Sequence, residues 1–372
     1  MLIGVPKEIK VHEYRVGLTP DSVREFTAHG HSVLVETNAG IGIGSSDDDY
    51  RGAGAEIAAV PEDIFAEADL IVKVKEPQAV ERQMLRPGQI LFTYLHLAPD
   101  PDQTRDLVKS GAICIAYETV TDGQGGLPLL APMSQVAGRL SIQAGAAALE
   151  RAKGGRGILL GGVPGVAPAK VVVIGGGVVG ENAIYMALGM AADVTVLDRN
   201  VSVLARLAYR FGAALRTVYS TKASLEDYVL EADLVIGGVL IAGAEAPKLV
   251  TRDMVRRMKP GAVLVDVAID QGGCFETSHP TTHAEPTYVV DGVVHYCVAN
   301  MPGAVPNTST YALNNVTLPY ALALADKGYK KALLDNPNFL EGLNVCQGKV
   351  TYKAVADELG YEYVDPRTAL AD

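Results

Sequence analysis

Residues 170–180 read KVVVIGGGVVG and decide the fold of the second half of the chain. An uninterrupted run of valine and isoleucine favours a buried strand, and the glycines that follow have the spacing G-x-G-x-x-G. A helix pattern comes next, and the apolar run 193–198 then ends in Asp198, about 20 residues beyond the glycines. Strand, glycine turn, helix and an acid at the next strand end predict a dinucleotide-binding unit.

Each position of this motif has a physical role. Gly175 allows the tight turn, Gly177 lets the backbone approach the pyrophosphate, and Gly180 lets the helix pack closely on the strand. Asp198 would accept hydrogen bonds from the ribose hydroxyls and repel a 2′-phosphate, which favours NAD over NADP. Arg199 follows directly and would offset part of that repulsion. The alternative is a glycine-rich turn with no ligand.

Strands and helices alternate on both sides of this motif. We expect further strands at 1–5, 31–36, 69–75, 90–97, 112–120, 169–174, 193–198, 213–219, 233–237, 262–266 and 293–298. Helices are predicted from Thr19-Pro20 to Gly30, between Asp100 and Gly111, and over 131–152, 310–327 and 350–359.

The alternation predicts an α/β protein with two doubly wound domains. A Rossmann NAD-binding domain at 129–306 would be inserted into a discontinuous, flavodoxin-like or Rossmann-like substrate domain made of residues 1–128 and 307–372. The long helix over 131–152 would connect the two domains.

Composition excludes several classes of partner. The formal net charge of −11 over 372 residues disfavours nucleic acid and anionic lipid. No apolar run reaches the roughly 18 residues of a membrane span, and MLIGVPKEIK lacks signal-peptide features, so we expect a cytoplasmic protein. The four cysteines form no C-x-x-C pair, which argues against zinc, and Cys297 is expected to be a small core residue.

Five polar residues lie at or just beyond the ends of predicted strands, at the edge where open parallel sheets bind ligands. They are Arg15, Lys75, His96, Asp270 and Asn300. Each has a plainer interpretation: Arg15 in a surface ion pair, Lys75 solvated beside Lys73, His96 in the core, and Asp270 capping a glycine turn. Position alone does not decide between these interpretations.

With these residues laid out, the chain resembles the alanine dehydrogenase family, which also includes the NAD-binding subunit of proton-translocating transhydrogenase. The resemblance runs through essentially the whole chain. It rests on the blocks IGVPKEIKVHEYRVGLTP (3–20), VKVKEP (72–77), TYLHLAPD (93–100), PLLAPMSQVAGRLS (128–141), VIGGGVVGENA (173–183), DVAIDQGGCFETSHPTTH (266–283) and YCVANMPGAVPNTSTYAL (296–313).

The resemblance implies reversible oxidative deamination of L-alanine to pyruvate and ammonium with NAD. It implies that Arg15 binds the substrate carboxylate, Lys75 lies near the reacting carbon, His96 is the general acid/base, and Asp270 is the second catalytic residue. It implies a homohexamer. The predicted cofactor contacts comprise the three motif glycines and the positions that the resemblance implies. They are Ser134, Gly175, Gly177, Val178, Val179, Gly180, Asp198, Ser220, Val239, Leu240, Val267, Ala268, Ile269, Asp270, Val298, Ala299, Asn300 and Met301.

The chain departs from the family pattern at three places. Val203 stands where some relatives carry a basic residue that binds the adenosine portion, and His279 stands where others carry arginine. Glu118 matches an acid that binds metal in some relatives, but Lys327 replaces the matching histidine, so we predict no metal.

Other activities stay open from the sequence. One is a non-enzymatic NAD-binding subunit that passes hydride between proteins, as in transhydrogenase. Another is a dehydrogenase that forms a different amino acid, such as lysine, or that takes glyoxylate or a larger aliphatic side chain as a secondary substrate.

Overall fold

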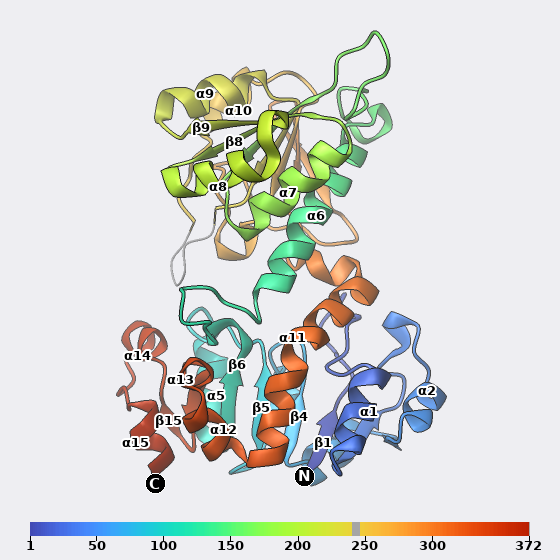
Figure 1. The fold of residues 1–372 in the computed structure, drawn as a ribbon, viewed down its shortest axis with the longest axis vertical. Coiled ribbons are helices and arrows are strands. Elements are labelled where there is room, and N and C mark those ends of the chain that lie inside the picture. Colours follow the sequence, from blue (N-terminus) through green and yellow to red (C-terminus); the bar gives the residue numbers. More distant parts are fainter. Residues whose placement is uncertain (240–245, 372) are drawn as a thin grey trace. The chain divides into compact units, whose positions relative to one another are not determined.

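The computed structural model describes residues 1–239 and 246–371, which form two compact units (Figure 1). Unit 1 comprises Met1–Met133 and Val305–Asp372, and unit 2 is the continuous stretch Ser134–Ala304. The predicted α/β class is confirmed, because each unit is built on its own mainly parallel sheet with helices between the strands.

Unit 1 contains an eight-stranded sheet in the order β15-β14-β6-β5-β4-β1-β2-β3. Strands β1 to β6 are parallel, whereas β14 runs antiparallel to β6 and β15 antiparallel to β14. The strands are β1 (Leu2–Val5), β2 (Ser32–Glu36), β3 (Glu56–Ala58), β4 (Leu70–Val72), β5 (Ile90–Thr93), β6 (Ile113–Ala116), β14 (Leu343–Cys346) and β15 (Lys349–Val350). The first six follow the order 3-2-1-4-5-6, so unit 1 has Rossmann rather than flavodoxin topology.

The helices of unit 1 connect these strands. They are α1 (Pro20–Ala28), α2 (Asp47–Gly52), α3 (Pro61–Glu67), α4 (Ala79–Arg82), α5 (Pro101–Ser110), α11 (Pro306–Lys327), α12 (Tyr329–Asp335), α13 (Pro337–Leu340), α14 (Lys353–Leu359) and α15 (Pro366–Ala371). Helix α1 begins as predicted, with the Thr19 side chain accepting the Ser22 N–H and Pro20 at the first helical position. Helix α5 ends at Gly111, whose φ of +70° suits a left-handed cap.

Unit 2 contains a seven-stranded sheet in the order β12-β13-β11-β10-β7-β8-β9. All neighbours are parallel except β12 and β13. The strands are β7 (Lys170–Ile174), β8 (Asp193–Asp198), β9 (Leu215–Tyr219), β10 (Leu234–Gly237), β11 (Val263–Asp266), β12 (Thr287–Val290) and β13 (Val293–Tyr296). Its helices are α7 (Val178–Gly189), α8 (Val201–Phe211), α9 (Lys222–Glu231) and α10 (Arg252–Arg257), and α6 (Ala131–Ala148) contains the boundary between the units.

Both cores are made by the central strands. Every residue of β4, β5 and β6 in unit 1 and of β10 and β11 in unit 2 is buried, as expected of parallel strands covered on both faces. Cys297 is buried, which confirms its expected core position, and the other three cysteines are also buried and unoxidised. Within the described ranges, no helix combines the length and apolarity that a bilayer crossing requires.

Several element boundaries differ from those expected. The strands predicted at 69–75 and 90–97 are shorter, since β4 ends at Val72 and β5 at Thr93. The helix predicted over 131–152 ends at Ala148. The helix predicted over 350–359 begins only at Lys353, because Val350 pairs with Val345 in a two-stranded antiparallel edge.

Candidate functional site

Both sheets reverse their strand order at one point, which is where open α/β sheets bind ligands. In unit 1 the reversal lies between β1 and β4, and in unit 2 between β7 and β10. The predicted substrate residues Arg15, Lys75 and His96 follow β1, β4 and β5. The motif glycines and Val239 follow β7 and β10, so each unit presents its predicted residues at its own switch point.

The motif glycines have the geometry that the sequence predicted. Gly175 has a φ of +94°, a conformation that favours glycine. A Cβ on Gly180 would lie 1.8 Å from the Gly175 carbonyl oxygen, so any side chain there would push α7 away from the turn. By contrast, a Cβ on Gly177 would meet nothing within 4 Å. Gly177 therefore faces open space at the N-terminus of α7, where backbone N–H groups and the helix dipole favour an anion.

Asp198 is fixed beside the glycine turn. One of its carboxylate oxygens accepts the Gly176 N–H at 2.7 Å, and the other accepts the Asn200 N–H at 2.7 Å. Each oxygen keeps a second lone pair with which it can accept a ribose hydroxyl. The acid at the end of β8 is thus oriented by the same turn that would hold the pyrophosphate.

The loop that carries Asp270 is fastened by a buried acid at the end of β11. Asp266 accepts the Ser278 hydroxyl at 2.6 Å and the Cys274 and Ala268 N–H groups at 2.9 and 3.1 Å. Burial raises the pKa of Asp266, although these hydrogen bonds lower it in part. Asp270 accepts the N–H of Asn300, at 3.3 and 3.4 Å from its two oxygens, so the loops after β11 and β13 meet.

Most of the remaining predicted cofactor residues lie at or just after strand ends of unit 2. Ser220 follows β9, and its N–H donates to the Asp198 carbonyl at 3.0 Å. Ser134 lies within α6, and Leu240 lies outside the described residues. The open space at Gly177, the free helix N-terminus and the oriented Asp198 together fit a bound dinucleotide.

Arg15 is buried in unit 1, with 2% of its surface exposed. Its Nε and Nη2 donate to the two carboxylate oxygens of Glu13 at 2.7 and 2.6 Å, and its Nη1 lies 3.1 Å from the Met133 sulfur. Burial alone would lower the pKa of Arg15, but the bidentate Glu13 raises it, so the guanidinium stays charged. The interpretation of Arg15 as a surface ion pair is therefore wrong.

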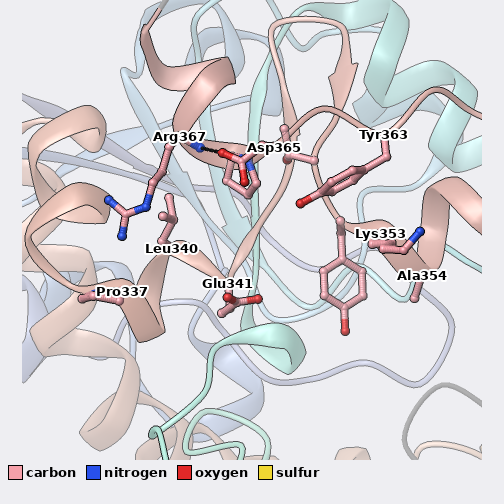
Figure 2. A pocket seen from close by; sticks show the side chains of 11 residues that line it. Pro337, Leu340, Glu341, Lys353, Ala354, Tyr363, Asp365 and Arg367 are labelled. Carbon is pink, nitrogen blue, oxygen red and sulfur yellow. Dashed lines mark hydrogen bonds between the residues drawn. The ribbon is translucent and has the colours of Figure 1, made fainter.

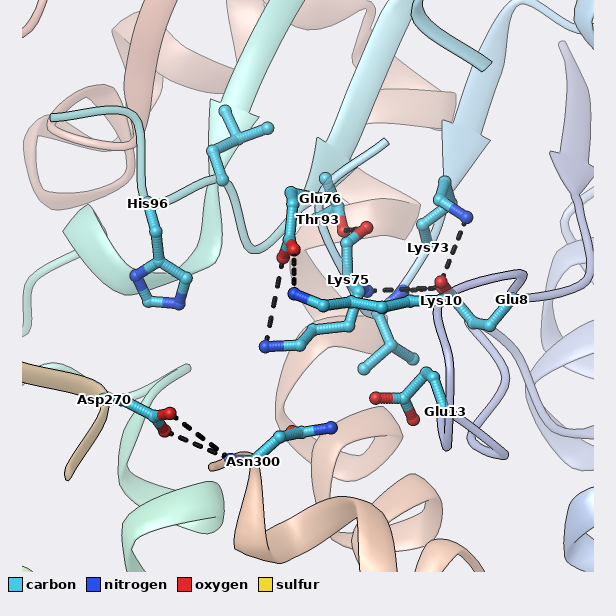
Figure 3. A network of polar contacts seen from close by, with 12 residues as sticks. Glu8, Lys10, Glu13, Lys73, Lys75, Glu76, Thr93, His96, Asp270 and Asn300 are labelled. Atoms are coloured by element: carbon cyan, nitrogen blue, oxygen red, sulfur yellow. Dashed lines mark hydrogen bonds and ion pairs between the residues drawn. The ribbon is translucent and has the colours of Figure 1, made fainter. Parts of the chain in front are cut away.

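The segment that carries Arg15 crosses the end of β4 at very close range. A Cβ on Gly17 would lie 2.2 Å from the Val72 carbonyl oxygen, so only glycine allows this crossing. Lys73 lies directly beyond Val72 and is fully buried. Its Nζ contacts Glu8 at 3.1 Å (Figure 3) and Glu81 at 2.7 Å, which makes a buried triad of two acids and one base.

Lys75 is held through its backbone. Glu8 accepts the N–H groups of Val74 and Lys75 at 2.7 and 3.3 Å, and the Thr93 hydroxyl donates to the Lys75 carbonyl at 2.9 Å. The Lys75 ammonium lies 3.9 Å from Glu76, which also pairs with Lys10 (Figure 3). The Lys75 side chain is 15% exposed, so the interpretation as a solvated lysine is also wrong.

His96 lies in the turn after β5, with 48% of its side chain exposed. Its backbone is left-handed, with a φ of +49°, and its N–H donates to Glu118 at 2.6 Å. Its ring lies parallel to that of Tyr94, with 5.9 Å between the centroids. An exposed imidazole on a fixed turn is not a core histidine, and it can exchange protons with a ligand or with water.

Comparison with known proteins agrees with this geometry. Models of the N-terminal and C-terminal domains of alanine dehydrogenase/PNT match residues 4–137 and 141–353. The chain belongs to the alanine dehydrogenase/PNT family. Curated alanine dehydrogenases of Halomonas elongata and Bacillus subtilis are 64% and 57% identical to it, covering 98% and 100% of this chain and 98% of each relative.

Solved structures of the family share the fold. An L-alanine dehydrogenase superposes with a TM-score of 0.94 at 52% identity, covering 97% of this chain and 99% of the other. A transhydrogenase from Sinorhizobium meliloti superposes with a TM-score of 0.81 at 24% identity, covering 95% and 100%, and shows the same fold.

The metal expected in some members of the alanine dehydrogenase/PNT family does not fit this chain. Both oxygens of Glu118 accept backbone N–H groups, and Lys327 pairs with Asp335 at 3.0 Å. Among residues 1–239 and 246–371, no three histidine, cysteine or acidic side chains are arranged to hold an ion.

Several residues that shape the site were not singled out from the sequence. Glu13 had a local signal, since it stands two residues before Arg15 in HEYR. Glu8, Lys73 and Glu81 had none, because Glu8 and Lys73 are 65 residues apart and lysines and glutamates are usually on the surface.

A cavity of about 310 Å³ lies elsewhere in unit 1, beside β15 at the far edge of the sheet (Figure 2). Its lining includes Leu340, Glu341, Tyr352, Tyr363 and Arg367. None of the predicted site residues lines it, so it belongs to a different part of the unit from the strand ends of β1, β4 and β5.

Proposed function

We propose that this chain catalyses the reversible, NAD-dependent oxidative deamination of L-alanine to pyruvate and ammonium. The observation that carries the proposal is a buried, acid-paired guanidinium at the same sheet edge as a backbone-fixed lysine and an exposed imidazole. Relatives named alanine dehydrogenase, 53–64% identical over nearly the whole chain, support the choice of L-alanine.

Unit 2 would hold the cofactor and unit 1 the amino acid. The N-terminal N–H groups of α7 would bind the pyrophosphate, and Asp198 the ribose hydroxyls. Among the described implied contacts, Ser220, Val267 and Val298 come at or just after the ends of β9, β11 and β13 of the same sheet. Bound NAD supplies the acceptor for the hydride that leaves the substrate Cα.

Arg15 would bind the carboxylate of L-alanine and fix the direction of its Cα–H bond. Glu13 keeps the guanidinium charged and holds its plane, so little orientational freedom is lost when the substrate binds. Lys75 would polarise the keto oxygen of pyruvate in the reverse direction. Its backbone is held on both sides, which limits where the ammonium can reach.

Proton movement would fall to His96 and Asp270. After hydride loss, water adds to the iminium carbon and the resulting carbinolamine collapses to pyruvate and ammonia. His96 would take the proton of the attacking water and return a proton to the leaving amine. Asp270 would orient the water and stabilise the positive charge of the iminium.

An absorbance assay tests the activity directly. NADH consumption is followed with pyruvate in the presence and absence of ammonium, and NADPH replaces NADH in a parallel series. The proposal expects ammonium-dependent consumption with NADH. Consumption without ammonium would indicate a hydroxy-acid dehydrogenase, and none under either condition would indicate a hydride-transfer subunit.

The family resemblance also leads us to propose a homohexamer that works in the cytoplasm. Light scattering coupled to size-exclusion chromatography gives the mass, which should be six times that of the 39.2 kDa chain. A mass of one or two chains would contradict the hexamer without affecting the proposed reaction.

A further inference from the structure

The turn that carries His96 has an unusual backbone. Its φ of +49° lies in the left-handed region, which residues with a Cβ rarely adopt. Such a conformation persists only where neighbouring groups impose it, and it is found preferentially at functional sites. The groups that impose it here therefore bear on how the imidazole is presented.

Glu118 supplies the main restraint. Its carboxylate accepts the His96 N–H at 2.6 Å. The Leu95 N–H donates to both oxygens of the same carboxylate, each at 3.2 Å. Hydrogen bonds to an ionised acceptor are about twice as strong as neutral ones. Glu118 is well placed to do this because it lies two residues after β6, in the short 3-10 helix Tyr117–Thr119, and β6 pairs with β5 up to Thr93 and Ala116.

Two further contacts complete the turn. The Gln103 amide donates to the Leu95 carbonyl at 2.5 Å, and the Tyr94 ring lies parallel to the imidazole with an interplanar angle of 8°. Gln103 is fully buried and Tyr94 nearly so, whereas about half of His96 is exposed. Buried groups thus hold the backbone of the turn, while the His96 side chain points away from that backbone (Figure 3).

We propose that Glu118 is a positioning residue for the reaction: by accepting the N–H groups of Leu95 and His96, it fixes the left-handed turn that aims the imidazole of His96. The carboxylate also lies 3.9 Å from the imidazole Nδ1. This role rests on the proposed function, and it assigns to Glu118 a hydrogen-bonding task instead of metal binding.

The test is a double-mutant cycle between Glu118 and His96. E118A removes both acceptor oxygens, and E118Q keeps one oxygen but loses the charge. We expect E118A to lower kcat by roughly 10- to 100-fold, as for a catalytic group displaced by about 1 Å, with KM for L-alanine changed less than about threefold. E118Q should lose less. In an H96A background, E118A should change kcat by less than about twofold, because it acts through His96.

A matched control comes from the same segment. Asp122 also caps a loop, accepting the Gln124 and Gly126 N–H groups at 2.8 Å, but among the described residues no hydrogen bond or ion pair joins its side chain to the 94–97 turn. D122N should leave kcat close to that of the parent. Amide hydrogen exchange of the full-length protein should accelerate at Leu95 and His96 in E118A and not in D122N.

The exchange experiment needs no activity, so it separates this proposal from the proposed function. A parent protein without alanine dehydrogenase activity would refute the function, and the exchange rates would still test whether Glu118 holds the turn. Unchanged exchange in E118A, an equal loss of kcat in both backgrounds, or recovery of E118A activity with Mg²⁺ or Mn²⁺ would each overturn the positioning role.

Discussion

Gly177→Ala isolates the contribution of the glycine turn to cofactor binding. The backbone of Gly177, with φ of −69° and ψ of −164°, is one that alanine adopts readily, and its new Cβ would meet nothing within 4 Å. Alanine is a poorer N-cap than glycine by about 0.5–1 kcal/mol, which lowers the Tm of a unit of this size by only about 2–4 °C. The same methyl group would occupy the space through which the pyrophosphate approaches. Losing one charge-assisted hydrogen bond costs about 1.5–3 kcal/mol, or roughly 10- to 150-fold in the Kd for NAD.

Two glycines of the same helix serve as controls in an NADH fluorescence titration with parallel thermal melts. Gly189→Ala adds a methyl with nothing within 4 Å, and it should leave both Kd and Tm at or slightly above the parent values. Gly180→Ala places a Cβ 1.8 Å from the Gly175 carbonyl oxygen and should lower both stability and affinity. If Gly177→Ala bound NADH as tightly as Gly189→Ala, the pyrophosphate would not lie at this turn and the reasoning would be refuted.

Three further predictions concern buried ionisable side chains. Arg15→Lys keeps the charge but loses the bidentate pair with Glu13. In steady-state kinetics, KM for L-alanine should therefore rise about tenfold or more, while the Kd for NADH stays unchanged. An unchanged KM would exclude Arg15 from substrate binding. Lys73→Met leaves Glu8 and Glu81 buried without their cation, and it should lower the free energy of unfolding by about 3–5 kcal/mol in urea titrations. Lys353 is exposed, so Lys353→Met should change the free energy of unfolding little. Equal effects of the two substitutions would contradict the buried triad. Burial lowers the pKa of His295, so its neutral form stabilises unit 2 above the unfolded value of about 6.5, and this contribution is lost as the pH falls through the lower folded value. Melts between pH 7.5 and 5.5 should therefore show a smaller loss of Tm in His295→Gln than in the parent, and parallel curves would argue against this role.

The glycine turn was predictable because every residue it needs lies within one strand, one turn and one helix. The left-handed φ of Gly175 is a local backbone requirement, and the contact that excludes a side chain at Gly180 is with the Gly175 carbonyl five residues earlier, so the spacing of the glycines carries the information. The caps at Thr19 and Gly111 were predictable for the same reason.

The strand ends were not predictable from local patterns. The apolar pattern of β5 continues past Thr93 to Leu97, yet the strand ends at Thr93 and the backbone is left-handed three residues later, at His96. The alternation of Lys73 with Lys75 left a solvated Lys75 open as an alternative, but Lys73 itself is buried between two acids. The short antiparallel strands β12, β14 and β15 depend on partners that the sequence does not identify, and β15 has only two residues.

The pairing of β6 with β14 has a consequence for how the protein is made. Ile115 lies beside Leu343 in the finished sheet, and the whole of unit 2 is synthesised between them. On the ribosome, β6 remains an open edge, available to neighbouring nascent chains, until the last stretch of the polypeptide emerges. Unit 2 is continuous in sequence, so it can fold before β14 and β15 have been synthesised and added to the sheet of unit 1.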